Sequence, residues 1–377
     1  MPKADKCNFY NLPKKYSPAD YKEATEHIIG KYSKINGLVS IYSWGGPSIP
    51  GISDLDLIFV FKNSRISSIS SMPVFKRAFY MLSNKFRYIA RHPFFYIEDI
   101  SFENIRHVYP DAEFKLLYGG NIRIKKLSYM ENYFSRIALL SDIIVRHYPR
   151  DFLEQMVIKS INTRDMLLRL NSLKRSIKTM EGLAKEKSSS WNYKLKQIDG
   201  LRKEWFDKND FDLLASLNED AVKICLEITE KFRDFLIKND LVEIYSGDNI
   251  EYKGARNNAI FTRDWSRKKA LRSMSELIIG KKMFFSMLPI ELAPQQIEYS
   301  RHKGIISTYV KNKLGRSLKY KLRYSGVVRK RAAIFNRQAE LASKLKHSDF
   351  VAFFDFGHRN KSGINNTILN LLRSCRD

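Results

Sequence analysis

One Gly- and Pro-rich segment between two apolar runs constrains the fold of this chain more than any other stretch. The runs, residues 38–42 and 57–61, are rich in the β-branched, aromatic and other apolar side chains that strands favour. Between them, residues 44–56 contain three glycines and two prolines, which are typical of turns. The sequence therefore predicts a strand, a turn and a second strand, with both strands buried.

Two aspartates lie where the second strand opens. Because side chains alternate along a strand, Asp54 and Asp56 are expected on one face, and Leu55 and Leu57 on the other. Two carboxylates side by side repel each other, and each resists desolvation. A bound divalent cation removes this cost, and oxygen ligands suit Mg²⁺, which completes its shell with water and substrate phosphates.

The turn itself has residues suited to phosphate binding. Gly45 and Gly46 allow a phosphate to approach the backbone closely. Ser48 and Ser53 each carry a hydroxyl that could donate to it. We therefore predict that these four residues form a phosphate-binding turn.

This arrangement resembles the nucleotidyltransferase superfamily of DNA polymerase β type, over roughly residues 19–125. The family signature is a Gly-Gly or Gly-Ser turn after a strand, followed by Asp-x-Asp at the start of the next strand; here Gly45-Gly46 and Asp54-Leu55-Asp56 match it. The resemblance implies that Asp54 and Asp56 bind two Mg²⁺ or Mn²⁺ ions. It also implies that a nucleoside triphosphate is the substrate and binds at the turn that contains Gly45, Gly46, Ser48 and Ser53. The spacing from Gly46 to Asp54 is shorter than in many members, so the loop over the phosphates is expected to be reduced.

The resemblance also implies a third carboxylate from a later strand. A strand is predicted at residues 94–97, and it runs directly into Glu98 and Asp99. By alternation these two side chains point to opposite faces, so only one of them can face the metal ions. Asp99 is favoured slightly, because Glu98 then lies with Tyr96 on the more polar face. Three possibilities therefore stay open: the third carboxylate is Asp99, it is Glu98, or it is absent.

The 377-residue length suggests two or three domains. The predicted fold class is α+β: a small mixed-sheet core at 1–125, a largely helical domain at 126–250, and a basic, mostly helical region at 251–377. Within the core, a helix is expected at 19–36 and another at 73–91. Apolar side chains at helical spacing support the second domain, in three stripes: Ile137, Leu140 and Ile144; Leu167, Leu170, Leu173, Ile177 and Met180; Cys225, Ile228, Phe232 and Phe235.

Positive charge is concentrated toward the C-terminal end. Residues 253–377 contain 27 Lys and Arg against 8 Asp and Glu, of a formal net charge of +26 for the whole chain. Basic runs such as 329–331 alternate with Tyr309, Tyr320, Tyr324 and Phe335. Such a mixture can neutralise phosphates and stack bases, so nucleic acid, another polyanion or an anionic membrane surface is the expected partner of this region.

The three cysteines are widely separated, which fits neither a disulfide framework nor a zinc site. No apolar stretch reaches the roughly 18–20 residues that a membrane-spanning helix needs, and no targeting segment opens the chain. We therefore expect a cytoplasmic protein without a transmembrane segment.

Two main hypotheses follow. In the first, the chain is an enzyme that moves a nucleoside monophosphate from a nucleoside triphosphate to a hydroxyl of an unidentified acceptor, releasing pyrophosphate. In the second, it is a catalytically degenerate nucleotidyltransferase fold that binds a polyanion. A third, adenylylation of a cationic antibiotic, is disfavoured because a protein of charge +26 repels a cation.

Overall fold

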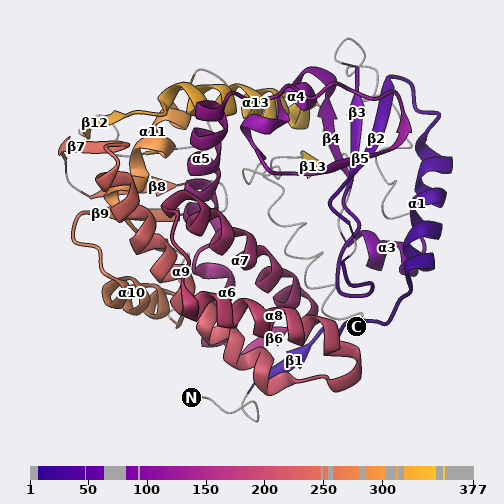
Figure 1. Cartoon of the computed structure of the whole chain (residues 1–377), viewed down its shortest axis with the longest axis horizontal. Helices are drawn as coiled ribbons and strands as arrows, with labels where there is room; N and C mark the ends of the chain where they lie inside the picture. Colours follow the sequence, from indigo (N-terminus) through magenta and orange to yellow (C-terminus); the bar gives the residue numbers. More distant parts are fainter. Residues whose placement is uncertain are drawn as a thin grey trace.

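The computed structural model describes residues 7–46, 48–62, 82–91, 94–247, 249–253, 258–279, 285–302, 311–312, 318–344 and 351–352. Its described part has three neighbouring regions: an N-terminal sheet, a central set of helices, and a C-terminal region of strands and helices (Figure 1). The predicted α+β class is confirmed at this level.

The N-terminal sheet has the order β13-β4-β3-β2-β5. Its strands are β2 (Leu38–Trp44), β3 (Leu57–Phe61), β4 (Phe95–Glu98), β5 (Phe114–Gly119) and β13 (Val351–Ala352). β2 is antiparallel to both β3 and β5, whereas β4 is parallel to β3 and to β13. The strand, turn and strand predicted at 38–61 are therefore present as an antiparallel pair at the middle of a mixed sheet.

Two helices cover one face of this sheet. They are α1 (Pro18–Tyr32) and α3 (Asn84–Ala90), and their apolar side chains form a core with Leu57, Phe59 and Phe61. α1 begins at a capping box in which the Ser17 hydroxyl accepts from the Asp20 amide and the Asp20 carboxylate accepts from the Ser17 amide. The predicted helix at 19–36 is confirmed, although it ends four residues earlier. Most of the helix predicted at 73–91 lies outside the described residues.

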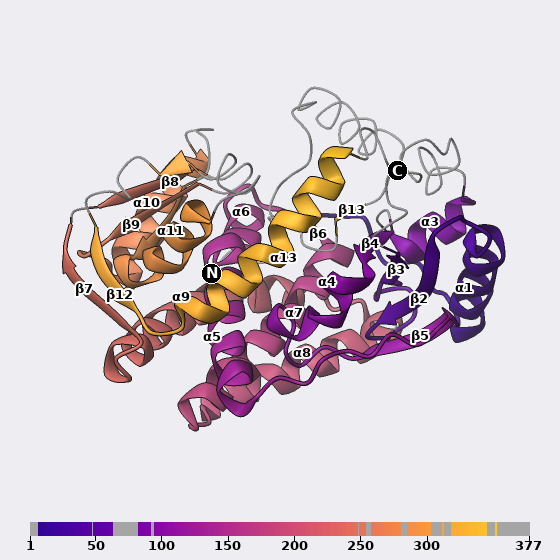
Figure 2. The ribbon, with the colours of Figure 1, turned by 90° about the horizontal axis from the view of Figure 1, so that it is seen from above.

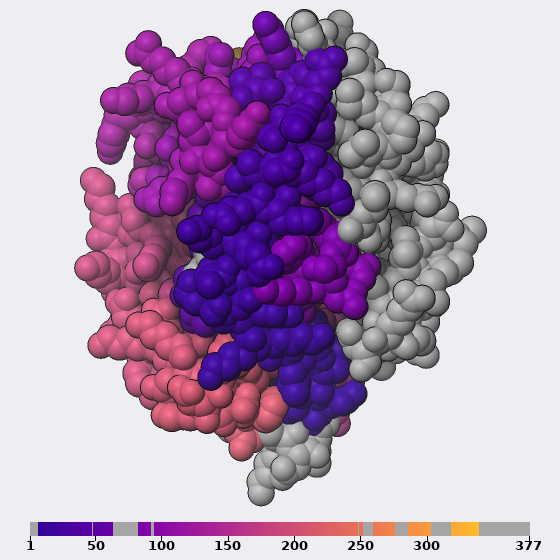
Figure 3. Space-filling model, turned by 90° about the vertical axis from the view of Figure 1, so that its right-hand side faces the viewer, coloured from indigo at the N-terminus to yellow at the C-terminus, as the bar shows by residue number. Residues whose placement is uncertain are grey.

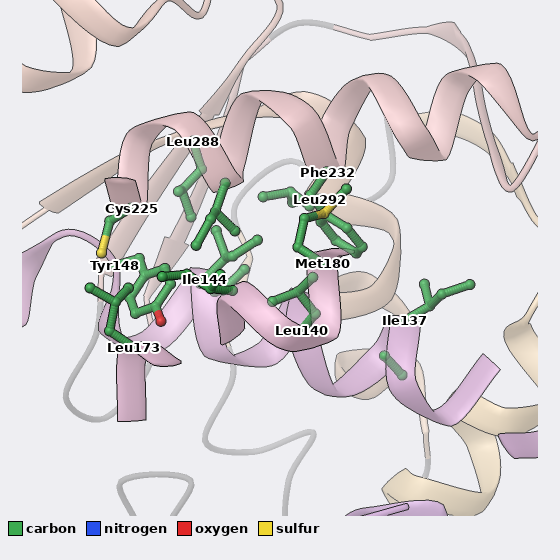
Figure 4. Packing of buried hydrophobic residues seen from close by; sticks show 14 of the residues in the cluster. Ile137, Leu140, Ile144, Tyr148, Leu173, Met180, Cys225, Phe232, Leu288 and Leu292 are labelled. Carbon is green, nitrogen blue, oxygen red and sulfur yellow. The ribbon is translucent and has the colours of Figure 1, made fainter. Parts of the chain in front are cut away.

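The central helices pack on the opposite face. They are α5 (Tyr129–His147), α6 (Arg150–Val157), α7 (Thr163–Ala184), α8 (Ser189–Lys208) and α9 (Phe211–Lys238). The residues of all three predicted stripes are buried, and Figure 4 shows Ile144, Leu173 and Phe232 among the side chains that meet between these helices. A short parallel pair, β1 (Asn8–Tyr10) and β6 (Ser160–Asn162), joins the N-terminal segment to the start of α7.

The described part of the C-terminal region is mostly helical, as predicted, but it also contains strands that were not predicted. It contains a sheet of order β10-β9-β8-β11, formed by β10 (Phe285–Pro289), β9 (Asn258–Thr262), β8 (Ile250–Lys253) and β11 (Lys311–Asn312). A second pair joins β7 (Val242–Ser246) to β12 (Lys319–Leu322). α10 (Arg267–Ile279), α11 (Ala293–Arg301) and α13 (Ser325–Lys344) complete it. These strands have five residues or fewer, and they are stabilised by partners far away in the sequence.

The three regions share one apolar core, which extends from Tyr42 in β2 to Phe335 in α13. α13 runs from the C-terminal region across the central helices toward the N-terminal sheet (Figure 2). Two shorter elements lie between β4 and β5 in the chain, α4 (Asp99–Glu103) and the 3₁₀ helix Ile105–His107, and the 3₁₀ helix contacts α5. Among the described helices, none combines the length and apolar content needed to cross a membrane.

Candidate active site at the turn before β3

Three long side chains fix the loop that precedes Asp54. The Tyr21 hydroxyl donates to the Ser53 carbonyl and accepts from the Gly51 amide at 3.0 Å, and the Tyr88 hydroxyl donates to the Gly51 carbonyl at 2.8 Å. The buried Arg164 of α7 donates to the Ile52 carbonyl at 3.2 Å, and its guanidinium lies 3.8 Å from the centre of the Tyr88 ring. The loop is therefore held from both α1 and α7, which makes the position of Asp54 well defined.

The conformation of this loop requires a glycine at position 51. Its φ of +88° lies in the left-handed region, and a Cβ there would sit 2.1 Å from the Lys14 carbonyl oxygen. No other residue type fits this position without moving the backbone.

Asp54 and Asp56 lie where the sequence predicts. Leu55 and Leu57 belong to the core beneath α1. Ile58 and Val60 belong to the core beneath the central helices, and they lie on the same face of the strand as Asp54 and Asp56, because side chains two residues apart point the same way. Both carboxylates are partly exposed on the face toward those helices. Asp56 is also close enough to Tyr109 to affect its ionisation. The pKa of the Tyr109 hydroxyl is raised to about 12, mainly by burial and to a smaller extent by the negative charges of Asp142 and Asp56, whereas two arginines act in the opposite direction.

The glycine turn borders the same space. Gly45 and Gly46 are both exposed, and the Gly45 amide donates to the Glu113 carbonyl at 3.1 Å. A Cβ on Gly45 would lie 3.9 Å from Nη2 of Arg175 in α7, and a Cβ on Gly46 would meet no atom within 4 Å. The turn therefore presents open backbone opposite an arginine.

The two serines differ. Ser53 is buried, and its hydroxyl accepts from the Ile49 amide at 3.1 Å and lies 3.2 Å from the Ser48 hydroxyl. Ser53 therefore stabilises the turn, and its predicted role as a phosphate donor is not supported by this geometry. Ser48 is exposed and remains a candidate.

Arg91 occupies the position beside Asp54. Arg91 is the residue that caps the C-terminal end of α3, and its side chain reaches Asp54. Nη1 of Arg91 lies 3.3 Å from Oδ2 of Asp54, and Nη2 lies 2.7 Å from Oδ1 of Asp165 in α7. One guanidinium thus joins the sheet to the central helices.

The predicted third carboxylate is not at this site. Glu98 pairs with Phe61, at the far end of β3, about 16 Å along the strand from Asp56 for a rise of about 3.3 Å per residue. Glu98 also follows the alternation of Tyr96, which lies in the core beneath α1, and its carboxylate is 3.3 Å from Nε of Arg337. Asp99 is at the same far end, as the first residue of α4. Because β3 and β4 are parallel, their beginnings lie side by side, and Glu98 and Asp99 at the end of β4 are at the opposite end of the pair from Asp54 and Asp56. The structure therefore does not bring either predicted third carboxylate together with the two aspartates.

The carboxylates present fit one divalent cation better than two. Asp54 and Asp56 supply oxygen ligands on one face, as Mg²⁺ requires when the substrate provides the remaining ligands. Within the described ranges, no group of three or more His, Cys, Asp or Glu side chains is placed to hold a metal ion. A second ion would have to take its ligands from the substrate, from water or from residues outside those ranges.

Two arginines of the central helices were not predicted. Arg175 of α7 and Arg202 of α8 interact electrostatically with each other, and Arg202 also with Asp54. Asn171 and Arg175 lie one helical turn apart, which places them on one side of α7, and Asn171 accepts a hydrogen bond from Arg202. Sequence offers only this weak signal, a polar pair at i and i+4 within an amphipathic helix.

The basic run at 329–331 is largely engaged within the protein. Arg331 is buried, and it donates to Asp142 of α5 at 2.6 Å and to the His107 carbonyl at 2.6 Å. Lys330 pairs with Glu131 at 2.5 Å, which leaves Arg329 exposed. Of the aromatic residues proposed to stack bases, Tyr324 and Phe335 are buried, and Tyr309 lies outside the described residues. The predicted polyanion surface therefore loses Arg331 and two of its aromatic side chains.

Comparisons of this chain with protein-family models, with curated proteins and with solved structures each found no match. The function is therefore argued from the geometry of the site.

Proposed function

We propose that this chain binds a metal–nucleoside triphosphate at the turn before β3 and transfers its nucleoside monophosphate to an acceptor hydroxyl. The observation that carries the proposal is the placement of Asp54 and Asp56 on one face of the sheet, with the exposed Gly45–Gly46 turn beside them and Arg175 opposite. Carboxylates for a cation and glycines for phosphates are the two elements that triphosphate binding needs.

The residues of the site have separate roles in this proposal. Asp54 and Asp56 hold the cation, which would neutralise charge on the phosphates and orient them. The Gly45–Gly46 turn lets the phosphates lie against the backbone, and Arg164, Tyr21 and Tyr88 keep the aspartates in place by fixing the loop. In the reaction, the acceptor oxygen bonds to the α-phosphorus, the bond from that phosphorus to the bridging oxygen breaks, and pyrophosphate leaves. The hydroxyl proton passes to a base or to water.

A second candidate is triphosphate binding without transfer. It is favoured by one observation, the distance of Glu98 and Asp99 from the aspartate pair. With two carboxylates the site suits the cation that accompanies the triphosphate, whereas activation of an acceptor hydroxyl usually requires a further ligand or base.

A transfer assay distinguishes the two. The full chain is incubated with Mg²⁺ and each of four α-³²P-labelled nucleoside triphosphates, together with mixtures of small hydroxyl compounds, RNA or protein. We expect pyrophosphate release and labelled product with the original chain, and neither of them with Asp56→Asn. Saturable metal-dependent binding without any labelled product would support the second candidate instead. Absence of both binding and transfer would reject the two together.

A further inference from the structure

The two-stranded ribbon of β7 and β12 carries a row of basic side chains on one face. Lys319, Lys321 and Arg323 are exposed, whereas Leu322 between them is buried. The amide of Arg323 donates to the Leu241 carbonyl at 3.0 Å, so the antiparallel pairing continues to this residue. Side chains two residues apart on a strand point the same way, about 6.6 Å apart. The three cationic groups therefore form one row along the exposed face of the ribbon.

A β-bulge places an aromatic ring beside this row. The register shifts between Lys319 and Tyr320, which leaves Tyr245 as the extra residue of β7. Bulges of this kind redirect a side chain. The Tyr245 hydroxyl donates to Glu243 at 2.6 Å, and Nζ of Lys321 lies 3.2 Å from the other oxygen of the same carboxylate. Glu243 thus holds the ring next to the lysine, while Tyr245 stays 61% exposed.

The charge of this face is not balanced within the described part of the chain. Residues 319–323 contain three basic residues and no acidic one, and the facing stretch 240–246 contains two acidic residues, Asp240 and Glu243. The charged groups of Lys319 and Arg323 form no ion pair with another described residue. Among the described residues of the ribbon, no large aliphatic side chain is exposed. The face therefore combines free cations with one tyrosine ring.

We infer that this face of the ribbon binds single-stranded nucleic acid. A row of cations can neutralise successive phosphates of an extended strand, and an exposed ring beside the row can stack on one of its bases. An anionic membrane would attract the same cations, but membrane binding is strengthened by buried apolar area, and the described ribbon offers no exposed aliphatic side chain for it.

The inference does not depend on the proposed function. The ribbon lies at one end of the molecule, and the N-terminal sheet with the turn before β3 lies at the other (Figure 1). Binding can therefore be measured without metal or nucleoside triphosphate, and Asp56→Asn should leave it unchanged.

The test measures binding of a fluorescein-labelled single-stranded RNA of mixed sequence to the full chain, by fluorescence anisotropy at several salt concentrations. The ribbon variant carries three glutamine substitutions, at Lys319, Lys321 and Arg323. We expect it to bind at least about tenfold more weakly, and the slope of log affinity against log salt to lose about 2 in magnitude, for three phosphates at about 0.7 each.

A matched control removes three charges from α8 instead, by glutamine substitutions at Lys196, Lys203 and Lys208. All three are exposed, and Lys208 pairs with Glu204 at 2.7 Å as Lys321 does with Glu243. Figure 3 shows the side of the molecule opposite the ribbon, where Phe206 of α8 lies against the loop at Gly51. The control should weaken binding by less than about threefold at moderate salt, because distant charges are screened. Equal losses in the two triple variants would overturn the inference, since they would indicate attraction by net charge alone.

The tyrosine is tested separately from the charges. Tyr245→Ala should weaken RNA binding by about fivefold to hundredfold, as expected for one base stacked on an aromatic ring, without changing the salt slope. Tyr245→Phe keeps the ring and should retain most of the affinity. Tyr193→Ala in α8 is the control, because Tyr193 is 60% exposed and also lies beside a lysine, with Nζ of Lys194 5.4 Å from the ring centre. Equal affinities of Tyr245→Ala and Tyr193→Ala would contradict stacking at the ribbon.

A footprint on the original chain avoids any effect of a substitution on folding. Lysines are acetylated with and without the RNA, and the modified positions are read by mass spectrometry. Lys319 and Lys321 should be protected by RNA, whereas Lys196 and Lys203 should not. Absence of protection at the ribbon would overturn the inference.

Two further ligands identify the kind of partner. Duplex RNA should bind more weakly than the single strand, because its bases are not free to stack on Tyr245. Duplex binding as tight as that of the single strand would contradict the inference. Binding to vesicles that contain phosphatidylserine, lost in the ribbon variant and accompanied by no RNA binding, would reject nucleic acid and make the ribbon a membrane-binding face.

Discussion

The guanidinium of Arg91 lies 3.3 Å from the carboxylate of Asp54, and the same guanidinium contacts Asp165 at 2.7 Å. Asp54 lies just before the beginning of β3, and Arg91 lies at the C-terminal end of α3. Arg91 therefore balances the charge of the first aspartate of the pair. A divalent cation that uses Asp54 as a ligand has to compete with this arginine.

This competition gives the first prediction. Arg91→Gln should bind Mn²⁺ several times more tightly than the original chain, because the carboxylate of Asp54 is released from its ion pair. Electron paramagnetic resonance of Mn²⁺ measures the affinity. Arg87→Gln, one turn earlier in α3, is the control, since Arg87 bonds to Asn84 and not to the site. Weaker Mn²⁺ binding in Arg91→Gln would mean that Arg91 supports the cation site instead of competing with it.

Alanine substitutions at two glycines of the turn should differ in their effect on stability. Gly51→Ala should cost well over about 1 kcal/mol of the free energy of unfolding, because its left-handed φ and the Lys14 carbonyl both exclude a Cβ. Gly46→Ala should change that free energy by less than about 0.5 kcal/mol, since a Cβ there meets open space. Urea denaturation of both variants measures the difference. Equal effects would contradict the described loop geometry.

The buried ion pair between Arg331 and Asp142 yields a third prediction. Arg331→Ala leaves Asp142 without its main partner among buried groups that include Tyr299, and should destabilise the protein by about 3–5 kcal/mol. Arg329→Ala, two residues earlier and exposed, should have an effect below about 0.5 kcal/mol. Thermal and urea unfolding compare the two variants. Similarly small losses of stability in both variants would contradict the burial of Arg331.

Acid unfolding tests the contact between α13 and the start of α5. Hydrogen bonds from Lys330, and then from the amide and hydroxyl of Ser128, lower the pKa of Glu131 from 4.5 to about 2. A lowered pKa means that Glu131 contributes fully to stability above its unfolded pKa of 4.5, and that this contribution is lost as the pH falls from there through about 2. Glu131→Gln should therefore be less stable than the original chain at pH 6, by roughly 1 kcal/mol for a pair that is partly exposed. The gap should close toward pH 2, and a gap that widened on acidification would have the wrong sign.

Local sequence patterns were sufficient to predict the elements that are determined by residues close together in the sequence. The turn at 44–56 has its glycines and prolines in place, α1 has its capping box at Ser17 and Asp20, and the apolar stripes of α5, α7 and α9 are continuous. The face of Asp54 and Asp56 follows from alternation alone. These predictions needed no information about distant partners.

The failures concern residues whose roles depend on distant pairing. Whether Glu98 lies near Asp56 depends on the direction of β4 relative to β3, and alternation does not determine direction. Arg331 reads as one member of a basic run, yet a carboxylate 189 residues earlier makes it a core residue. The short strands of the C-terminal region have few residues over which a period of two can be distinguished from a helical pattern.

The most direct measurement of the central claim is equilibrium binding of a nucleoside triphosphate, by calorimetry, with and without Mg²⁺. It compares the original chain with Asp56→Asn and with Asp99→Asn, which alters a carboxylate at the far end of the sheet. The account predicts Mg²⁺-dependent binding that is lost in Asp56→Asn and unchanged in Asp99→Asn, because only Asp56 lies beside the glycine turn. Mg²⁺-dependent binding that survives in Asp56→Asn, or that is lost in Asp99→Asn, would contradict it.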